Sequence, residues 1–112
     1  MKATLGLAFL IVLALCCDSC KKQNSDTIKP WIELKGSNPV YSELGKPYQD
    51  AGAIVWDVNA SGDTVDISNR LTVTDNINTE VVGKYEVYYN AADDADNSAD
   101  EVIRTVYIQI FK

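Results

Sequence analysis

Two long segments near the C-terminus alternate between apolar and polar side chains, and this alternation restricts the fold more than any other feature of the sequence. In residues 83–91 one face carries Tyr85, Val87, Tyr89 and Ala91. In residues 102–111 the corresponding face carries Val102, Arg104, Val106, Ile108 and Ile110. Because successive side chains point to opposite faces of a strand, both segments are predicted to be strands. Each buries one face and exposes the other, as strands of antiparallel sheets do.

The rest of the chain after Pro30 consists of short segments rich in Val, Ile, Tyr, Thr and Trp, which are separated by Gly, Asn, Asp and Pro. This pattern is typical of strands joined by turns, and no stretch has a helical periodicity. The short strands are predicted at Trp31–Leu34, Val40–Ser42, Ala53–Val58, Val65–Ile67 and Leu71–Thr74. About seven strands without helices, at this length, predict an all-β fold built as a two-sheet antiparallel sandwich.

The first twenty residues have the pattern of a bacterial lipoprotein signal peptide. Lys2 supplies a positive charge, and Leu5–Leu15 is an apolar run that is too short to span a bilayer, which needs about 20 residues. Three cysteines follow, and the Ser-Cys-Lys-Lys around Cys20 resembles the lipoprotein junctions of Bacteroides-type bacteria. Cys20 is therefore the predicted lipidated residue, with Cys17 and Cys16 as alternatives. An ordinary secretory peptide with incidental cysteines is the other interpretation.

This pattern predicts three parts: a signal peptide over residues 1–19, the lipidated cysteine and a flexible polar tether over residues 20–30, and one domain over residues 31–112. Fewer than a hundred residues remain after cleavage, which is enough for one small domain. The expected product is a fatty-acylated (palmitate) lipoprotein of the outer membrane, facing the periplasm or the cell surface. The membrane is then its first partner, through the lipid anchor.

Composition excludes several classes of function. The chain contains no histidine, which excludes Ser-His-Asp and Cys-His catalysis and histidine-ligated zinc. All three cysteines lie at or before position 20, so the domain is held by packing without a disulfide. Residues 31–112 contain six basic and fourteen acidic residues, and this balance disfavours a nucleic-acid partner, which needs clustered Lys and Arg.

Three segments carry a family motif: GKPYQDAGA at residues 45–53, VGKYEVYYNA at residues 82–91, and DDADNSA at residues 93–99. Together they resemble the bacterial Ig-like repeat first noted in a pesticidal crystal protein. Its theme is roughly G-x-x-Y-x-D-x-G-A, followed by G-x-Y-x-V-x-Y-x-A-x-D-x-x-G-N-x-A. The resemblance extends from Trp31 to the C-terminus and implies an immunoglobulin-like sandwich. Two departures affect the final hairpin: Asp96 replaces the usual glycine before Asn97, and residues 100–102 lengthen the approach to the last strand.

The resemblance also implies a structural role and a setting. Gly83 and Tyr85 resemble the tyrosine corner of immunoglobulin-like sandwiches, in which the phenol bonds to nearby backbone. Val87 stands where antibody domains carry their second cysteine, in agreement with a core that lacks a disulfide. Related domains occur at the N-termini of Bacteroides-type surface lipoproteins, some of which are tied to polysaccharide capture.

Acidic residues cluster before the last predicted strand: Asp93, Asp94, Asp96, Asn97, Asp100 and Glu101. Several oxygen ligands in one loop are what Ca²⁺ requires, so Asp93, Asp94 and Asp96 are candidate metal ligands. The segment lacks the turn glycine and the distant glutamate of a calcium loop, and solvated carboxylates without any cofactor are the alternative. Asp50 is predicted to brace a turn through neighbouring backbone.

The candidate ligand-binding residues are aromatic, because aromatic faces pack on sugar rings. They are drawn from Trp31, Tyr41, Trp56, Tyr88 and Tyr107. Trp56 alternates with Ala53 and Val55, which take the inward positions, so it is expected either to contact a ligand or to pack between strands. Tyr88 and Tyr107 share the outward face of neighbouring strands and are either ligand contacts or a cross-strand pair.

These features predict a non-enzymatic, lipid-anchored binding module that assists in capturing a polysaccharide or an envelope protein. A structural spacer without a ligand is the alternative, and an absence of exposed aromatic side chains would favour it. A carboxylate-based hydrolase is the third hypothesis, and it requires two carboxylates facing each other about 5 to 10 Å apart. The sequence contains no recognisable pair of this kind.

Overall fold

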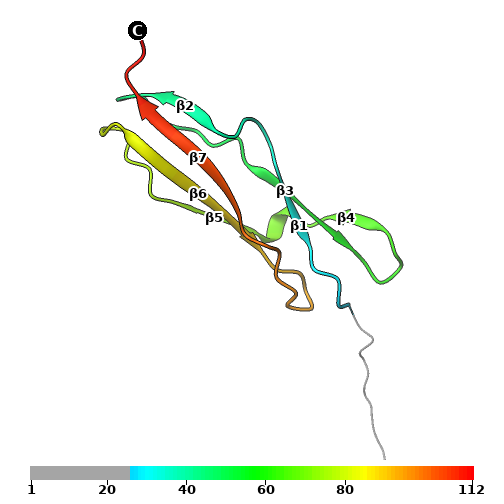
Figure 1. Ribbon diagram of the computed structural model, residues 1–112. Helices are drawn as coiled ribbons and strands as arrows, with labels where there is room; N and C mark the ends of the chain where they lie inside the picture. Colours follow the sequence, from blue (N-terminus) through cyan, green and yellow to red (C-terminus); the bar gives the residue numbers. More distant parts are fainter. Residues whose placement is uncertain (1–25) are drawn as a thin grey trace, which may run out of the picture.

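Seven strands in two sheets form the part of the chain that the computed structural model describes, residues 26–112 (Figure 1). The predictions for Cys16, Cys17, Cys20 and the signal peptide fall outside these residues. The strands are β1 (Trp31–Leu34), β2 (Val40–Glu43), β3 (Ala53–Val58), β4 (Thr64–Asp66), β5 (Leu71–Asp75), β6 (Gly83–Ala91) and β7 (Val102–Gln109). A short 3₁₀ helix, η2 (Ser68–Arg70), precedes β5. Within residues 26–112, no helix has the length and apolar character needed to cross a membrane.

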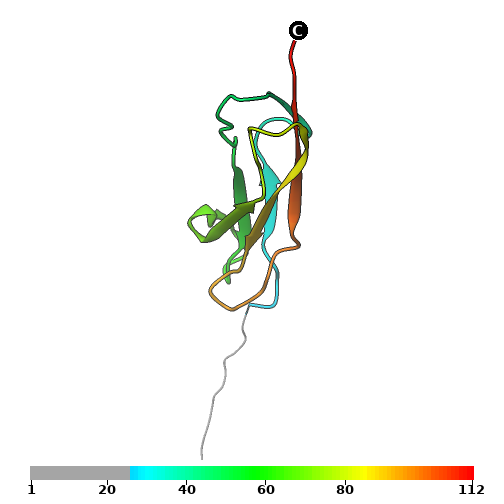
Figure 2. The ribbon, with the colours of Figure 1, turned by 90° about the vertical axis from the view of Figure 1, so that its left-hand side faces the viewer.

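The strands form a three-stranded sheet in the order β1-β3-β4 and a four-stranded sheet in the order β2-β7-β6-β5. The two sheets face each other as the layers of a sandwich (Figure 2). Their inner faces meet in a core where Ala53 of β3 packs with Val87, Tyr89, Val106 and Ile108 of β6 and β7. The predicted all-β, two-sheet sandwich is therefore confirmed.

The alternation along β6 is the one expected from the sequence. Val87, Tyr89 and Ala91 are buried, and the residues between them are only partly covered. In β7, Arg104, Val106 and Ile108 are buried in the same way.

The end of the last strand differs from the prediction. β7 stops at Gln109, where pairing with Glu43 ends, and Ile110 is 65% exposed. The chain leaves the sheet beyond this point (Figure 1), so Ile110 has no inner face to occupy.

One strand pair corrects the prediction of purely antiparallel sheets. β2 runs parallel to β7, with Tyr41 opposite Tyr107, whereas the other pairs are antiparallel. The chain crosses from one sheet to the other between β1 and β2 without reversing direction (Figure 1). Gly36 permits this crossing: it has a φ of +75°, and a Cβ there would lie 2.8 Å from the Cβ of Ala51.

Residues 26–30, predicted as part of a flexible tether, contact the domain. The Asp26 carbonyl accepts a hydrogen bond from the Asn97 side chain at 3.1 Å. Lys29 forms an ion pair with Asp100 at 2.7 Å, and Pro30 is buried. The described end of the tether therefore lies against the loop between β6 and β7.

Candidate functional site

A buried arginine organises the polar interior of the sandwich. Arg104 of β7 is fully buried, and its Nε lies 3.1 Å from the Asp50 carboxylate and donates to the Tyr89 hydroxyl at 2.9 Å. Its other nitrogens donate to the backbone carbonyls of Lys35, Ser37 and Gly52. The guanidinium thus ties β7 to the segments that flank β1 and β3. The sequence placed Arg104 on an apolar face but gave it no role.

Asp50 is the ion-pair partner of Arg104 and accepts hydrogen bonds from three donors. Its carboxylate accepts hydrogen bonds from the Tyr48 hydroxyl at 2.6 Å, from the Gly52 N–H at 2.9 Å and from Tyr89. Burial alone would raise the pKa of Asp50, but hydrogen bonds from Tyr48, Tyr89 and Gly52, together with the charge of Arg104, lower the pKa below 3.8. Burial and the bond to Asp50 raise the pKa of Tyr89 to about 12. The G-x-x-Y-x-D-x-G-A motif therefore supplies three members of this network, Tyr48, Asp50 and Gly52. The hydrogen bond from Gly52 to Asp50 is the expected Asx turn.

The corner residues, Gly83 and Tyr85, lie at the start of β6. The Tyr85 hydroxyl donates to the Val81 carbonyl at 2.7 Å, four residues upstream, which is the geometry of a tyrosine corner. Gly83 faces the same ring, since a Cβ at this position would lie 3.6 Å from it. Both residues hold the start of β6, and neither lines the two hollows described below.

The three candidate metal ligands have separate partners. Asp93 is buried and accepts the backbone N–H groups of Ala95 and Asn97 at 2.9 and 2.8 Å. Asp94 is exposed and pairs with Arg70 at 2.7 Å, and Asp96 is an exposed turn residue with a φ of +65°. Among the described residues, the carboxylates that approach Asp93 are those of Asp26 and Asp57.

Trp56 lies on the outer face of the three-stranded sheet, because Ala53 and Val55 occupy the inner positions of β3. It is half-buried and stands directly opposite Trp31 of β1, which is 45% exposed. The indole Nε1 of Trp56 donates to Glu33 Oε1 at 2.8 Å. Trp31, Glu33 and Trp56 together form what we call the indole surface.

The tyrosine candidates lie on the outer face of the other sheet but do not pair with each other. Tyr88 is opposite Ile103 and donates to Glu86 at 2.7 Å. Tyr107 is opposite Lys84 on one side and stacks on Tyr41 of β2 on the other, with ring centroids 5.3 Å apart. The suggested cross-strand pair of Tyr88 and Tyr107 is therefore absent, since the register separates them along β6 and β7.

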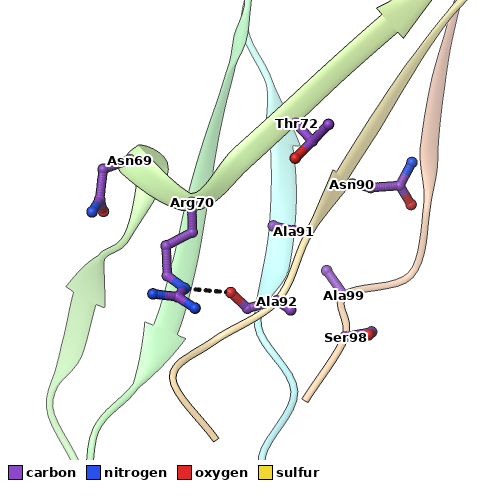
Figure 3. Close-up of a pocket in the computed structure, with 8 residues that line it drawn as sticks. All are labelled: Asn69, Arg70, Thr72, Asn90, Ala91, Ala92, Ser98 and Ala99. Atoms are coloured by element: carbon purple, nitrogen blue, oxygen red, sulfur yellow. Dashed lines mark hydrogen bonds between the residues drawn. The ribbon is translucent and has the colours of Figure 1, made fainter. Parts of the chain in front are cut away.

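An open hollow of about 540 Å³ lies where β5 and η2 meet the end of β6 (Figure 3). Its lining is small and polar: Asn69, Arg70, Thr72, Asn90, Ala91, Ala92, Ser98 and Ala99. Arg70 is fixed there by a hydrogen bond from Nε to the Ala92 carbonyl at 2.6 Å. No candidate residue from the sequence lines this hollow, and it contains no carboxylate with which to hydrolyse a substrate. Apart from Arg70, its lining side chains are small and uncharged, and they gave no sequence signal.

A family model described as a bacterial surface protein, Ig-like domain, matches residues 32–108. Among solved structures, a lipoprotein from Bacteroides thetaiotaomicron shares the fold, with a TM-score of 0.57 and 20% sequence identity. The match covers 74% of this chain and 39% of that lipoprotein, so this chain spans less than half the length of that protein. No curated protein matches the sequence.

Proposed function

Because the chain belongs to the family of bacterial surface proteins with an Ig-like domain and is therefore a cell-envelope Ig-like module, we propose that it is a lipid-anchored module that captures glycans. The indole surface is the proposed contact. Domains of this family are generally non-enzymatic, and the proposal contains no catalytic step.

The observation that carries this proposal is the pairing of two indoles on an outer face. Trp31 is 45% exposed, and Trp56 stands directly across from it, so their side chains are neighbours on one surface. An exposed aromatic patch bordered by polar groups marks an interaction site. Glu33 fixes the Trp56 ring through its Nε1 and adds a carboxylate that accepts hydrogen bonds from sugar hydroxyls.

The anchor in this proposal is Cys20, with Cys17 and Cys16 as alternatives, and the location is the outer membrane, on its periplasmic or surface side. The apolar run and cysteine cluster of the first twenty residues support it. The B. thetaiotaomicron structure that shares the fold is itself described as a lipoprotein. The acidic balance of the domain argues against a nucleic-acid partner.

A spacer without a ligand is the second candidate, and exposed aromatic residues weigh against it. Besides Trp31, Tyr41 is 58% exposed and stacks on Tyr107. A protein partner in the envelope would use the same surfaces, because aromatic side chains are enriched at protein interfaces.

A glycan array tests the proposal and separates these candidates. The protein, purified in detergent as the cell processes it, is applied beside Trp31→Ala and Trp56→Ala variants and a Tyr107→Ala control on the other sheet. We expect the parent and Tyr107→Ala to bind the same glycans and both tryptophan variants to lose at least tenfold in affinity.

Absence of any bound glycan in the parent would contradict the glycan proposal and favour the spacer or a protein partner. Loss of binding in Tyr107→Ala alone would contradict the assignment of the contact to the indole surface.

A further inference from the structure

Three carboxylates from distant parts of the sequence converge at the end of the sandwich where the N-terminal segment meets the β6–β7 loop (Figure 1). They belong to Asp26 before β1, Asp57 in β3 and Asp93 after β6, and each offers an oxygen within 4.8 Å of the others. The three line a hollow of about 220 Å³. This arrangement is not a run of solvated loop carboxylates, because Asp57 and Asp93 are both buried.

Asp57 is the least satisfied member of the cluster. It lies on the inner face of β3 and is only 6% exposed, and its Oδ1 has no hydrogen-bond partner. A buried carboxylate oxygen without a partner costs free energy that folding does not recover. Burial, with the nearby charges of Asp26 and Asp93, raises the pKa of Asp57.

The basic residues do not neutralise the cluster. Among residues 26–112, no Lys or Arg forms an ion pair with any of the three carboxylates. Arg70 also lines the hollow, but its guanidinium pairs with Asp94 and donates to the backbone carbonyls of Ala92 and Asp93. Like charges at this spacing repel one another, and a proton or a cation between the oxygens would relieve this repulsion.

We propose that Asp26, Asp57 and Asp93 bind one divalent cation, Ca²⁺, with the unpartnered Asp57 Oδ1 as a ligand. Ca²⁺ accepts carboxylate oxygens in flexible geometry and completes its shell with water and carbonyls, which suits ligands from three separate segments. Zn²⁺ is disfavoured, because its structural sites use Cys and His. The ion joins the described end of the tether to β3 and to the β6–β7 loop. It thereby fixes the positions of these three segments relative to one another. This role is independent of glycan capture.

Calorimetric titration tests the site in the detergent-purified protein after chelator treatment, with CaCl₂ and MgCl₂ as the probes at pH 7.5. We expect one Ca²⁺ per chain, weaker binding of Mg²⁺, and a rise in the unfolding midpoint of about 5 °C or more in saturating Ca²⁺. Asp57→Asn should weaken Ca²⁺ binding at least tenfold and abolish the rise. Asp63→Asn is the matched control, because it removes the same charge from an exposed position. This variant should keep both the affinity for Ca²⁺ and the rise in the unfolding midpoint.

A further readout tests whether the Asp57 carboxylate is an unpaired buried group when the cation is absent. In chelator, Asp57→Asn should unfold at the same temperature as the parent or higher, because it removes a buried unpaired charge. If Asp57→Asn does not fold, Asp26→Asn, which lies outside every strand, takes its place with the same expected loss of Ca²⁺ binding.

The site is overturned if the parent shows no Ca²⁺ binding at millimolar concentration, or if both aspartate variants bind Ca²⁺ as tightly as the parent. Equal or tighter binding of Mg²⁺ would overturn the assignment to calcium.

Discussion

Arg104 is the residue on which the interior of this sandwich most depends. A fully buried guanidinium is expensive to desolvate, but here a carboxylate, a phenol and three backbone carbonyls surround it. Its partners come from the segments after β1 and before β3, so one side chain fixes the positions of both. The domain contains no cysteine and therefore no disulfide, and this network cross-links segments that are distant in the sequence.

Replacing Arg104 with Met should lower the free energy of unfolding by about 3–5 kcal/mol, because the change removes the positive charge beside the Asp50 carboxylate and the side-chain donor of the Lys35 and Ser37 carbonyls. Urea denaturation followed by tryptophan fluorescence measures the effect. Lys84→Met, an exposed change on β6, is the control and should stay within about 0.5 kcal/mol. A similar small effect for Arg104→Met would show that the network is dispensable.

Asp50 gives the protein a specific acid sensitivity. Its pKa is lowered in the folded state from the ordinary value of 3.8, so its contribution to stability is present above that value and is lost as the pH falls through the lower, folded pKa. Asp50→Asn should be less stable than the parent at pH 6, and the difference should shrink as the pH drops below 3.8. Unfolding midpoints across pH 2–6 check this, and a constant difference would contradict it.

The elements show which structural features the sequence determines. The bounds of β1, β3 and β6 agree with the prediction, because alternation and turn residues act locally. The parallel pairing of β2 with β7 was not predictable in this way, since it depends on where the chain crosses between sheets. The early end of β7 was not predictable for the same reason, because it also depends on the neighbouring strand. Ile110 continues the alternation on the inward side, but no strand lies beside it.

The backbone of the β6–β7 loop is strained at Asp96, and a substitution by glycine should relieve this strain. This residue has a φ of +65°, in the left-handed region that favours glycine, and the family theme has glycine there. Asp96→Gly should therefore raise the free energy of unfolding by about 0.5–1 kcal/mol. Ala95→Gly, the neighbouring change at a position without positive φ, should lower it by a similar amount. Thermal unfolding of the parent and the two variants measures these differences in stability. Destabilisation by both changes would contradict this account of the loop.

At the scale of the whole molecule, the candidate sites were harder to predict than the fold. The sequence identified Trp56 and its outward face, but Trp31 became its partner only through the register of β1 and β3. Asp93 was found in a local acidic run, whereas Asp26 and Asp57 join it from 67 and 36 residues away by sandwich packing. Local patterns locate strands and turns, but a surface or a cluster depends on which strands become neighbours.

The proposed architecture places the indole surface on a sandwich that a lipid anchor holds at the membrane. The described end of the tether packs against the domain through Asp26, Lys29 and Pro30. In this proposal the module is held at the end where these residues pack, and its outer sheet faces are available to a ligand.

Co-sedimentation of fluorescent polysaccharides with the membrane fraction of cells that produce the protein tests this account most directly. Membranes with the parent or with Tyr107→Ala should retain the label. Membranes with Trp31→Ala or Trp56→Ala should lose it while keeping the protein, and Cys20→Ala should remove the protein from the membrane. Equal retention of polysaccharide by membranes with the parent and with both tryptophan variants would contradict the account.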